Sequence, residues 1–338
     1  WSRVLYYGGL LMLATRRTKY SHYHQTGFTL IELMISLVLG LIVSAAVIQV
    51  YFINVKTSSI QASGSELQDA SVFGLQQLEK KVRLANLGNP VTKIDGTTVN
   101  GGVVLTGANL GMTVPYLNTG YLTRRDGDVT VGSDGWTGVS NTNTKSDQLT
   151  IQYINITGRE LSDCEGSTAA VNDIVVERYF LRQVTGSPTT GVIRNLVLAC
   201  DAGRVNTAGG IRVISPANDP RNFGQAGQEF ITNVDQFKVL LGTQLVSGAN
   251  AGKMMYLPSN AYLTITADRP AIMAVKIGLI VHGSTPIIGS DDQTSFTLLG
   301  QSNALKTDAS RQKQVRTTYE TTTLLRNARI VNITGINL

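Results

Sequence analysis

The sequence predicts an α+β protein: a long N-terminal helix, membrane-spanning in its first half, packs on a C-terminal antiparallel β-sheet domain with long loops. Two observations predict this class. No side chain from Leu33 to Phe52 is charged, and beyond Pro90 the chain is rich in Gly, Thr, Asn and Ser, with short β-branched runs between turn signals. The predicted segments are a leader at 1–27, a membrane-spanning helix at 28–53, an amphipathic continuation at 54–89 and a β-rich globular domain at 90–338.

The apolar run is long enough to cross a membrane as a helix. From Phe28 to Phe52 such a helix spans roughly 37 Å, against a hydrocarbon core of about 30 Å. Arg16, Arg17 and Lys19 precede it and indicate a cytoplasmic amino end. A secretory signal peptide has a shorter apolar region of about 7–15 residues, and a buried core helix tolerates this length poorly. A plain signal anchor fits the length and the basic flank equally well.

The helix is predicted to continue without a break from about Phe28 to near Leu87, roughly 90 Å at the standard rise. Residues 54–87 contain no proline and carry an apolar stripe at mostly three- or four-residue steps, formed by Leu67, Leu75, Leu78, Val82 and Ala85. This stripe is expected to pack under the globular domain. Gly88-Asn89-Pro90 is expected to end the helix.

Seven segments of the remaining chain are predicted strands because β-branched and aromatic residues lie between turn signals. They are Gln148–Ile154, Ile174–Leu181, Val192–Leu198, Gln236–Leu241, Tyr262–Thr266, Ala271–Val281 and Thr318–Leu325. Ala271–Val281 is interrupted only by Lys276, so it is predicted to form the centre of the sheet. Val91 to Asn143 is rich in glycine and weakly periodic, and long loops with a short hairpin or two are expected there.

One carboxylate lies at the head of the apolar helix. Glu32 follows Gly27 by five residues within the run Gly27-Phe28-Thr29-Leu30-Ile31-Glu32. An acidic residue inside lipid costs on the order of 2.5–3.5 kcal/mol even on the mild insertion scale, so it normally implies a partner or a function. The simpler alternative is that Glu32 lies near enough to the interface for its carboxylate to reach water.

This run resembles the processing motif of type IV pilins and type II secretion pseudopilins. The resemblance implies that a membrane peptidase cuts after Gly27 and methylates the new amino terminus at Phe28. It also implies that Glu32 pairs with the amino terminus of a subunit in the growing filament, whose core the segment 28–53 then forms. Met12 is the expected true start of the leader, so residues 1–11 are not expected to belong to the fold.

Three short segments of the globular domain resemble the PilW-type minor pilins: Ser146–Tyr153, Asn233–Val239 and Leu324–Asn327. The resemblance implies a minor pilin in the assembly, initiation or tip complex of a type IV pilus. The implied partners are other minor and major pilins, the prepilin peptidase and the inner-membrane assembly platform, with a tip adhesin as a further candidate. The implied location is the inner membrane, with a single span and a periplasmic C-terminal domain, and then the tip or base of the pilus. A J-type pseudopilin of type II secretion is the alternative within this superfamily, and a signal-anchored periplasmic binding or adhesive protein is the alternative from another class.

Cys164 and Cys200 are the only cysteines, and both lie in the part predicted to be exported. A disulfide between them is expected because exported thiols can be oxidised. In the chain-entropy model a loop of this length is worth on the order of 3–4 kcal/mol. Two buried free thiols or a metal site are the alternatives, but two cysteines without a neighbouring histidine make zinc a poor expectation.

The charge pattern argues against nucleic-acid binding. Without residues 1–27 the chain keeps 25 basic and 23 acidic residues, a net charge of +2 instead of +6. The nearest basic cluster, Arg311, Lys313 and Arg316, alternates with polar residues and is interpreted as a solvated face.

Catalysis and metal binding find little support in the sequence, and no cofactor is expected. His282 is the only histidine after residue 27, without metal spacing or a serine elbow around it, and is interpreted as a strand-end residue. Asp126, Asp128 and Asp134 could supply oxygen ligands to calcium, but the EF-hand spacing is absent. Turn-forming aspartates are the preferred interpretation.

Overall fold

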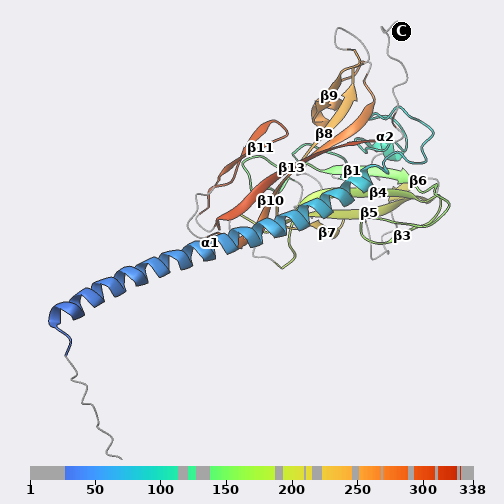
Figure 1. Ribbon diagram of the computed structural model, residues 1–338. Coiled ribbons are helices and arrows are strands. Elements are labelled where there is room, and N and C mark those ends of the chain that lie inside the picture. Colours follow the sequence, from blue (N-terminus) through green and yellow to red (C-terminus); the bar gives the residue numbers. More distant parts are fainter. Residues whose placement is uncertain are drawn as a thin grey trace, which may run out of the picture. The chain divides into compact units, whose positions relative to one another are not determined.

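The computed structural model describes residues 27–112, 121–126, 138–186, 193–208, 211–214, 223–245, 251–267, 269–287, 293–308, 311–325 and 328. The chain divides into two compact units, residues 1–53 and 54–338. Helix α1 (Leu30–Val82) runs through the boundary between them, and the sheets belong to the second unit (Figure 1).

The described residues of the first unit are the apolar part of α1 and the three residues before it. Its large side chains are exposed from Leu30 to Ile53, and the most apolar stretch of α1 has a mean hydropathy of 2.5. By length and composition this helix can cross a membrane. It begins at Leu30, two residues later than predicted, because Thr29 occupies the capping position before the first turn.

In the second unit, α1 packs on the sheets through the predicted stripe. Leu67, Leu78 and Val82 are buried, Leu75 packs against the same core, and Ala85 is buried just past the helix. Gly74 also faces the sheets: a Cβ there would lie 2.6 Å from Cγ1 of Ile231. The prediction that this face packs under the globular domain is confirmed.

The helix ends at Val82, five residues before the predicted end. The chain then tightens into turns whose hydrogen bonds span three residues, from Leu84 N–H to Lys81 O and from Leu87 N–H to Leu84 O, each 2.9 Å long. Asn86 has a φ of 66°, which a helix cannot contain. Its side-chain oxygen accepts a hydrogen bond from Gly102 N–H, and its amide donates to Val91 O. Asn86 therefore fixes the exit of the chain.

The second unit contains two larger antiparallel sheets where the sequence predicted one. The first has the order β1-β4-β5-β6, with β7 also paired to β5 (Figure 1). Its strands are β1 (Leu149–Ile154), β4 (Ile174–Gln183), β5 (Leu196–Ala208), β6 (Ile211–Ile214) and β7 (Gln228–Ile231). In its centre, Tyr179 of β4 is opposite Cys200 of β5. A small hairpin of β2 (Leu161–Ser162) and β3 (Thr168–Ala169) lies between β1 and β4 in the sequence.

The second sheet has the order β13-β10-β8-β9. Its strands are β8 (Val234–Gln244), β9 (Met254–Leu257), β10 (Ile272–Pro286) and β13 (Gln314–Leu324). Ile277 of β10 is opposite Val239 on one side and Thr321 on the other, so the predicted central strand does have partners on both edges. A hairpin of β11 (Ser295–Leu298) and β12 (Gln301–Ala304) packs on the β10 residue Ile280.

The main hydrophobic core joins α1 and both sheets. On β10 its members are Ile272 and then, in strict alternation, Val275, Ile277, Leu279 and Val281. Ile280 points to the opposite face, where Phe296 and Leu298 cover it. Because β10 is buried on both faces, its sequence is almost continuously apolar.

Two predicted strands differ from the structure. Tyr262–Thr266 is not a strand: the short helix α3 (Ser259–Leu263) follows Pro258, and the Tyr262 hydroxyl donates to Pro270 O over 2.7 Å. The segment predicted as Val192–Leu198 enters β5 only at Leu196. Between Val91 and Asn143 the described residues form loops, the helix α2 (Gly107–Leu110) and isolated bridges such as Val103 to Ile151, with no hairpin.

Candidate functional site

The peptide bond between Gly27 and Phe28, just before α1, is exposed. Gly27 and Phe28 precede the helix in non-helical conformation, and the Phe28 side chain is 83% exposed. Among the described residues, no atom lies within 4 Å of the position that a side chain at Gly27 would take. No described residue therefore blocks the access of an enzyme to the bond between Gly27 and Phe28.

Thr29 and Glu32 together cap this end of the helix. The Thr29 hydroxyl accepts a hydrogen bond from Glu32 N–H over 3.3 Å and lies 3.5 Å from a Glu32 carboxylate oxygen, to which it donates. Threonine followed three residues later by glutamate is a common helix-start pairing. Among the described residues, Glu32 has no cation as a partner. Its charge is thus uncompensated within this part of the chain, at the head of an apolar helix.

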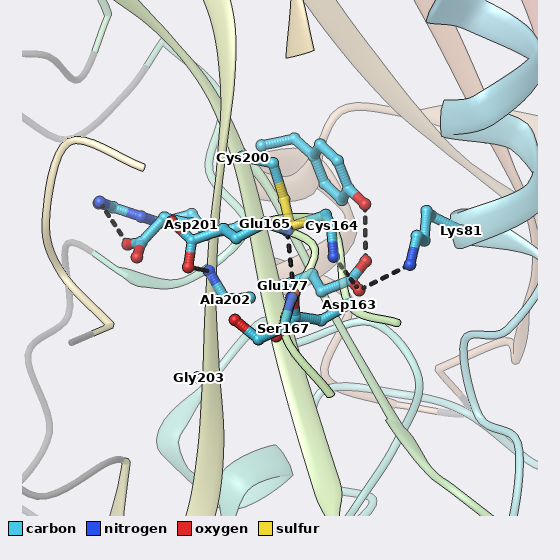
Figure 2. The surroundings of a disulfide bond; sticks show 12 residues. Lys81, Asp163, Cys164, Glu165, Ser167, Glu177, Cys200, Asp201, Ala202 and Gly203 are labelled. Carbon is cyan, nitrogen blue, oxygen red and sulfur yellow. Dashed lines mark hydrogen bonds and ion pairs between the residues drawn. A yellow bond between two sulfur atoms is a disulfide. The ribbon is translucent and has the colours of Figure 1, made fainter. Parts of the chain in front are cut away.

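A second cluster of chemically active groups lies in the first sheet, around a disulfide bond (Figure 2). Cys164, in the loop between β2 and β3, is bonded to Cys200 of β5, with 6.1 Å between their Cα atoms. The pairing expected from the sequence is confirmed. Because it joins residues 36 apart, it ties the small hairpin to the central strand of the sheet.

Glu177 of β4 lies beside this disulfide and is fully buried. Its carboxylate accepts hydrogen bonds from the hydroxyls of Tyr179 (2.6 Å) and Tyr153 (3.2 Å) and from Cys164 N–H (3.0 Å). Nζ of Lys81, in the last turn of α1, is 3.5 Å away. Burial raises the pKa of the Glu177 carboxyl above its ordinary range, and the charge of Lys81 opposes this shift. Burial and the Glu177 charge raise the pKa of Tyr179 in turn.

Several polar contacts besides the disulfide hold the Cys164 loop on the sheet. Arg204 of β5 donates to Asp163 over 2.8 Å, and Ala202 N–H donates to Glu165 over 3.2 Å. Lys81 donates to Ser162 O. The loop is therefore positioned by contacts on both sides of Cys164.

Two segments of the chain match protein-family models. Residues 23–48 match the prokaryotic N-terminal methylation motif, and residues 212–327 match the type IV pilus-assembly protein W, PilW. The chain therefore carries both the methylation motif of pilins and a segment that matches PilW. Its role is that of a minor pilin in type IV pilus assembly.

A type IV-like pilin from Thermus thermophilus has a similar structure, with a TM-score of 0.35 and 12% sequence identity, over 78% of this chain and 98% of that chain. No curated protein matches the chain significantly. The two matched segments contain Gly27 to Glu32 and the whole second sheet. The disulfide cluster lies outside both segments.

Asp126 contacts two cationic side chains of the protein itself. Lys238 donates to its carboxylate over 2.9 Å, and Arg125 lies 3.4 Å away. Asp126 has a φ of 60°, as in a turn, and its N–H donates to Asp147. Asp128 and Asp134, the other two candidates for a calcium site, lie outside the described residues.

His282 and Arg316 are placed differently from their predicted positions. His282 lies inside β10, which continues to Pro286, and its Nε2 is 3.9 Å from Asp235 of β8. The Arg316 side chain is 2% exposed and donates to the same Asp235 over 2.8 Å. Arg316 is therefore a buried ion-pair partner, where the sequence predicted a solvated face. Both residues connect strands of the second sheet.

Lys81 and Glu177 were not predicted from the sequence as part of a site. Glu177 and Arg178 stand between apolar residues in the predicted strand Ile174–Leu181, and both are buried. This pair of adjacent charges inside an apolar strand is the signal that could have identified Glu177. Because successive side chains of a strand point to opposite faces, each face of the sheet must accommodate one buried charge. Lys81 gives no comparable signal, since lysine is common in the last turn of a helix.

Proposed function

We propose that this minor pilin is inserted in the bacterial inner membrane through residues 28–53, with residues 90–338 in the periplasm. Prepilin peptidase cleaves between Gly27 and Phe28 and methylates Phe28. The mature, non-enzymatic subunit then joins other pilins in the initiation or tip complex of the pilus. The observation that supports this most strongly is the accessible Gly27–Phe28 bond at the head of an apolar helix, inside the segment that matches the methylation motif.

Two further observations support the proposed orientation. Arg16, Arg17 and Lys19 precede the span, as expected for a cytoplasmic amino end. The Cys164–Cys200 disulfide belongs to the part that this orientation exports, and disulfides persist in oxidising compartments.

In this proposal Glu32 is the docking group for the filament. An α-ammonium and a carboxylate are each costly in an apolar surrounding, and pairing between subunits offsets much of that cost. The described part of the chain offers Glu32 no cation, which leaves its charge available for the methylated amino terminus of a neighbouring subunit. The other proposed partners are the prepilin peptidase, the inner-membrane assembly platform and a tip adhesin. The match to a pilus-assembly family favours a pilus over a type II secretion system.

Intact-mass measurement of the membrane-extracted chain tests maturation. In cells with active prepilin peptidase the expected species begins at methylated Phe28, and in cells without the peptidase the leader stays attached. A chain that keeps residues before Phe28 in peptidase-positive cells contradicts the proposal and favours a signal-anchored protein that never polymerises.

Paired variants test the role of Glu32. Glu32→Gln removes the charge but keeps the size of the side chain, whereas Thr29→Val removes only the capping hydroxyl. Glu32→Gln is expected to be processed normally, to accumulate in the inner membrane and to reduce pilus number in a deletion background. Thr29→Val is expected to retain normal piliation. Equal defects in both variants would assign the effect to the helix cap instead of to pairing between subunits.

A further inference from the structure

The disulfide pocket brings three potential metal ligands together. Sγ of Cys164, Sγ of Cys200 and a carboxylate oxygen of Glu177 lie within 4.8 Å of one another (Figure 2). In a tetrahedral zinc site, with Zn–S bonds of about 2.3 Å and Zn–O bonds of about 2.1 Å, neighbouring ligand atoms are roughly 3.5–3.8 Å apart. Once the bond between the sulfurs is broken, the two sulfurs have to separate to reach that spacing, whereas the carboxylate oxygen is already within 4.8 Å of both.

We propose that, in the reduced chain, Cys164, Cys200 and Glu177 bind a thiophilic divalent cation such as Zn²⁺ or Cd²⁺. Metal binding and the disulfide are then alternative states of one pocket. A newly exported chain passes through the reduced state before oxidation, so the two states compete at that stage. The third ligand is a carboxylate 13 residues from Cys164 in the sequence, on a neighbouring strand, and not a histidine.

The pocket keeps its shape without the disulfide because other contacts position both cysteines. Cys200 lies inside β5, which is paired to β4. Cys164 N–H donates to Glu177, and the adjacent loop residues are held by Arg204 and Lys81. These contacts do not involve sulfur, so they survive reduction.

The charges of the occupied site balance. Two thiolates and one carboxylate carry three negative charges, against two positive charges on the metal and one on Lys81, which lies 3.5 Å from Glu177. The two thiols release two protons when the metal binds. The hydroxyls of Tyr179 and Tyr153 orient the carboxylate, as the outer partners of a metal-bound carboxylate do.

The pocket also has a side from which a metal can enter. Glu177 and Cys200 are fully buried, whereas Cys164 is only partly buried. In the proposed site the metal, and a water molecule that completes a fourth position, would approach from the loop that carries Cys164.

Cadmium titration of the full chain in detergent micelles tests this site. A phosphine reductant cleaves the disulfide: the phosphine becomes a phosphine oxide, and water supplies its oxygen and the two thiol protons. After oxygen-free removal of the reductant, CdCl₂ is added and the thiolate-to-cadmium absorption band is recorded. One Cd²⁺ per reduced chain and none per oxidised chain are expected, and Zn²⁺ should displace the Cd²⁺.

Four variants identify the ligands. Cys164→Ser and Cys200→Ser should each abolish the absorption band, and Glu177→Gln should weaken Cd²⁺ binding at least tenfold. Glu320→Gln, which changes a carboxylate that pairs with Lys276 in the second sheet, is the matched control and should bind as the wild type does. No band in the reduced wild type overturns the proposal. Equal Cd²⁺ affinity of Glu177→Gln and wild type also overturns it. The two thiolates alone would then account for Cd²⁺ binding, and Glu177 would not be a ligand.

Discussion

Lys81 and Glu177 form an ion pair between the last turn of α1 and the centre of the first sheet, with Nζ 3.5 Å from the carboxylate. Glu177 is fully buried, while the Lys81 side chain keeps 18% of its exposure. The charge of Lys81 therefore lowers the free-energy cost of burying the Glu177 carboxylate.

Lys81→Met should destabilise the globular unit most at neutral pH. Removing the cation leaves Glu177 buried with hydroxyl and N–H donors alone, at an expected cost of about 2 kcal/mol. The variant also raises the pKa of Glu177 further, since burial already raises it and Lys81 opposes that shift. Denaturant unfolding of the two proteins at several pH values measures the difference.

The sign of this pH dependence follows from proton binding. A carboxyl whose pKa is raised by folding contributes stability below its ordinary pKa and loses it as the pH rises through the folded pKa. The gap between wild type and Lys81→Met should thus shrink as the pH falls through the raised folded pKa values of Glu177, above the ordinary glutamate range. A gap that stays constant with pH contradicts the assignment of the effect to Glu177.

Arg316→Met should be more damaging than the loss of an exposed ion pair. Arg316 and Asp235 are both almost fully buried, and an unpaired carboxylate there is expected to cost about 3–5 kcal/mol. Adding Asp235→Asn to Arg316→Met should restore part of the loss. Lys276→Met is the control, because its pair with Glu320 is partly exposed and worth about 0–1 kcal/mol. Equal losses in the two single variants would contradict the buried pair.

Leu78→Ala should create a cavity between α1 and the sheets. Leu78 is fully buried in the main core, and such truncations cost about 2–5 kcal/mol. Phe73→Ala changes the same helix at a side chain that is 63% exposed, so its effect on folding should be within about 0.5 kcal/mol. Hydrogen exchange of residues 74–87 in the full chain would compare them. Similar exchange rates in both variants are incompatible with the observed packing.

Replacing both cysteines with serine should lower the free energy of unfolding by about 3–4 kcal/mol, because the unfolded chain regains the freedom of the closed loop. Non-reducing denaturant titration measures this loss. A second measurement is thiol labelling of the denatured, unreduced wild type. We expect that neither Cys164 nor Cys200 is labelled. Full labelling would contradict the bridge.

Strong periodic patterns allowed much of the fold to be predicted. The stripe from Leu67 to Ala85 and the apolar strand around Ile277 are dictated by burial, which selects residue type at regular spacing. Tyr262–Thr266 was misread because its alternation imitates a strand, whereas the preceding Pro258 starts a helical turn and the Tyr262 hydroxyl finds a partner at Pro270. Tertiary contacts decide such short segments.

One part of the candidate site could be predicted from the sequence, and the other part could not. Gly27, Phe28 and Glu32 are contiguous, so the sequence alone brings them together. The cluster of Lys81, Cys164, Glu177 and Cys200 is assembled from a helix, a loop and two strands, and strand pairing sets its geometry. The division into two sheets is equally invisible in a list of strands, because partners are chosen over long distances along the chain.

The contacts of α1 within the second unit also determine how that unit bears mechanical load. Ser59 donates a hydrogen bond to Pro286 O, and Glu66 accepts one from Ser284. Glu79 accepts a hydrogen bond from the Thr321 hydroxyl, and Lys81 forms an ion pair with Glu177. From Ser59 to Lys81 these anchor points extend along roughly 33 Å of helix. Tension applied along the helix axis, as when a subunit is drawn out of a membrane, would act on them in shear and in parallel. Rupture then requires several bonds to fail together, whereas a pull perpendicular to the axis would open them one at a time.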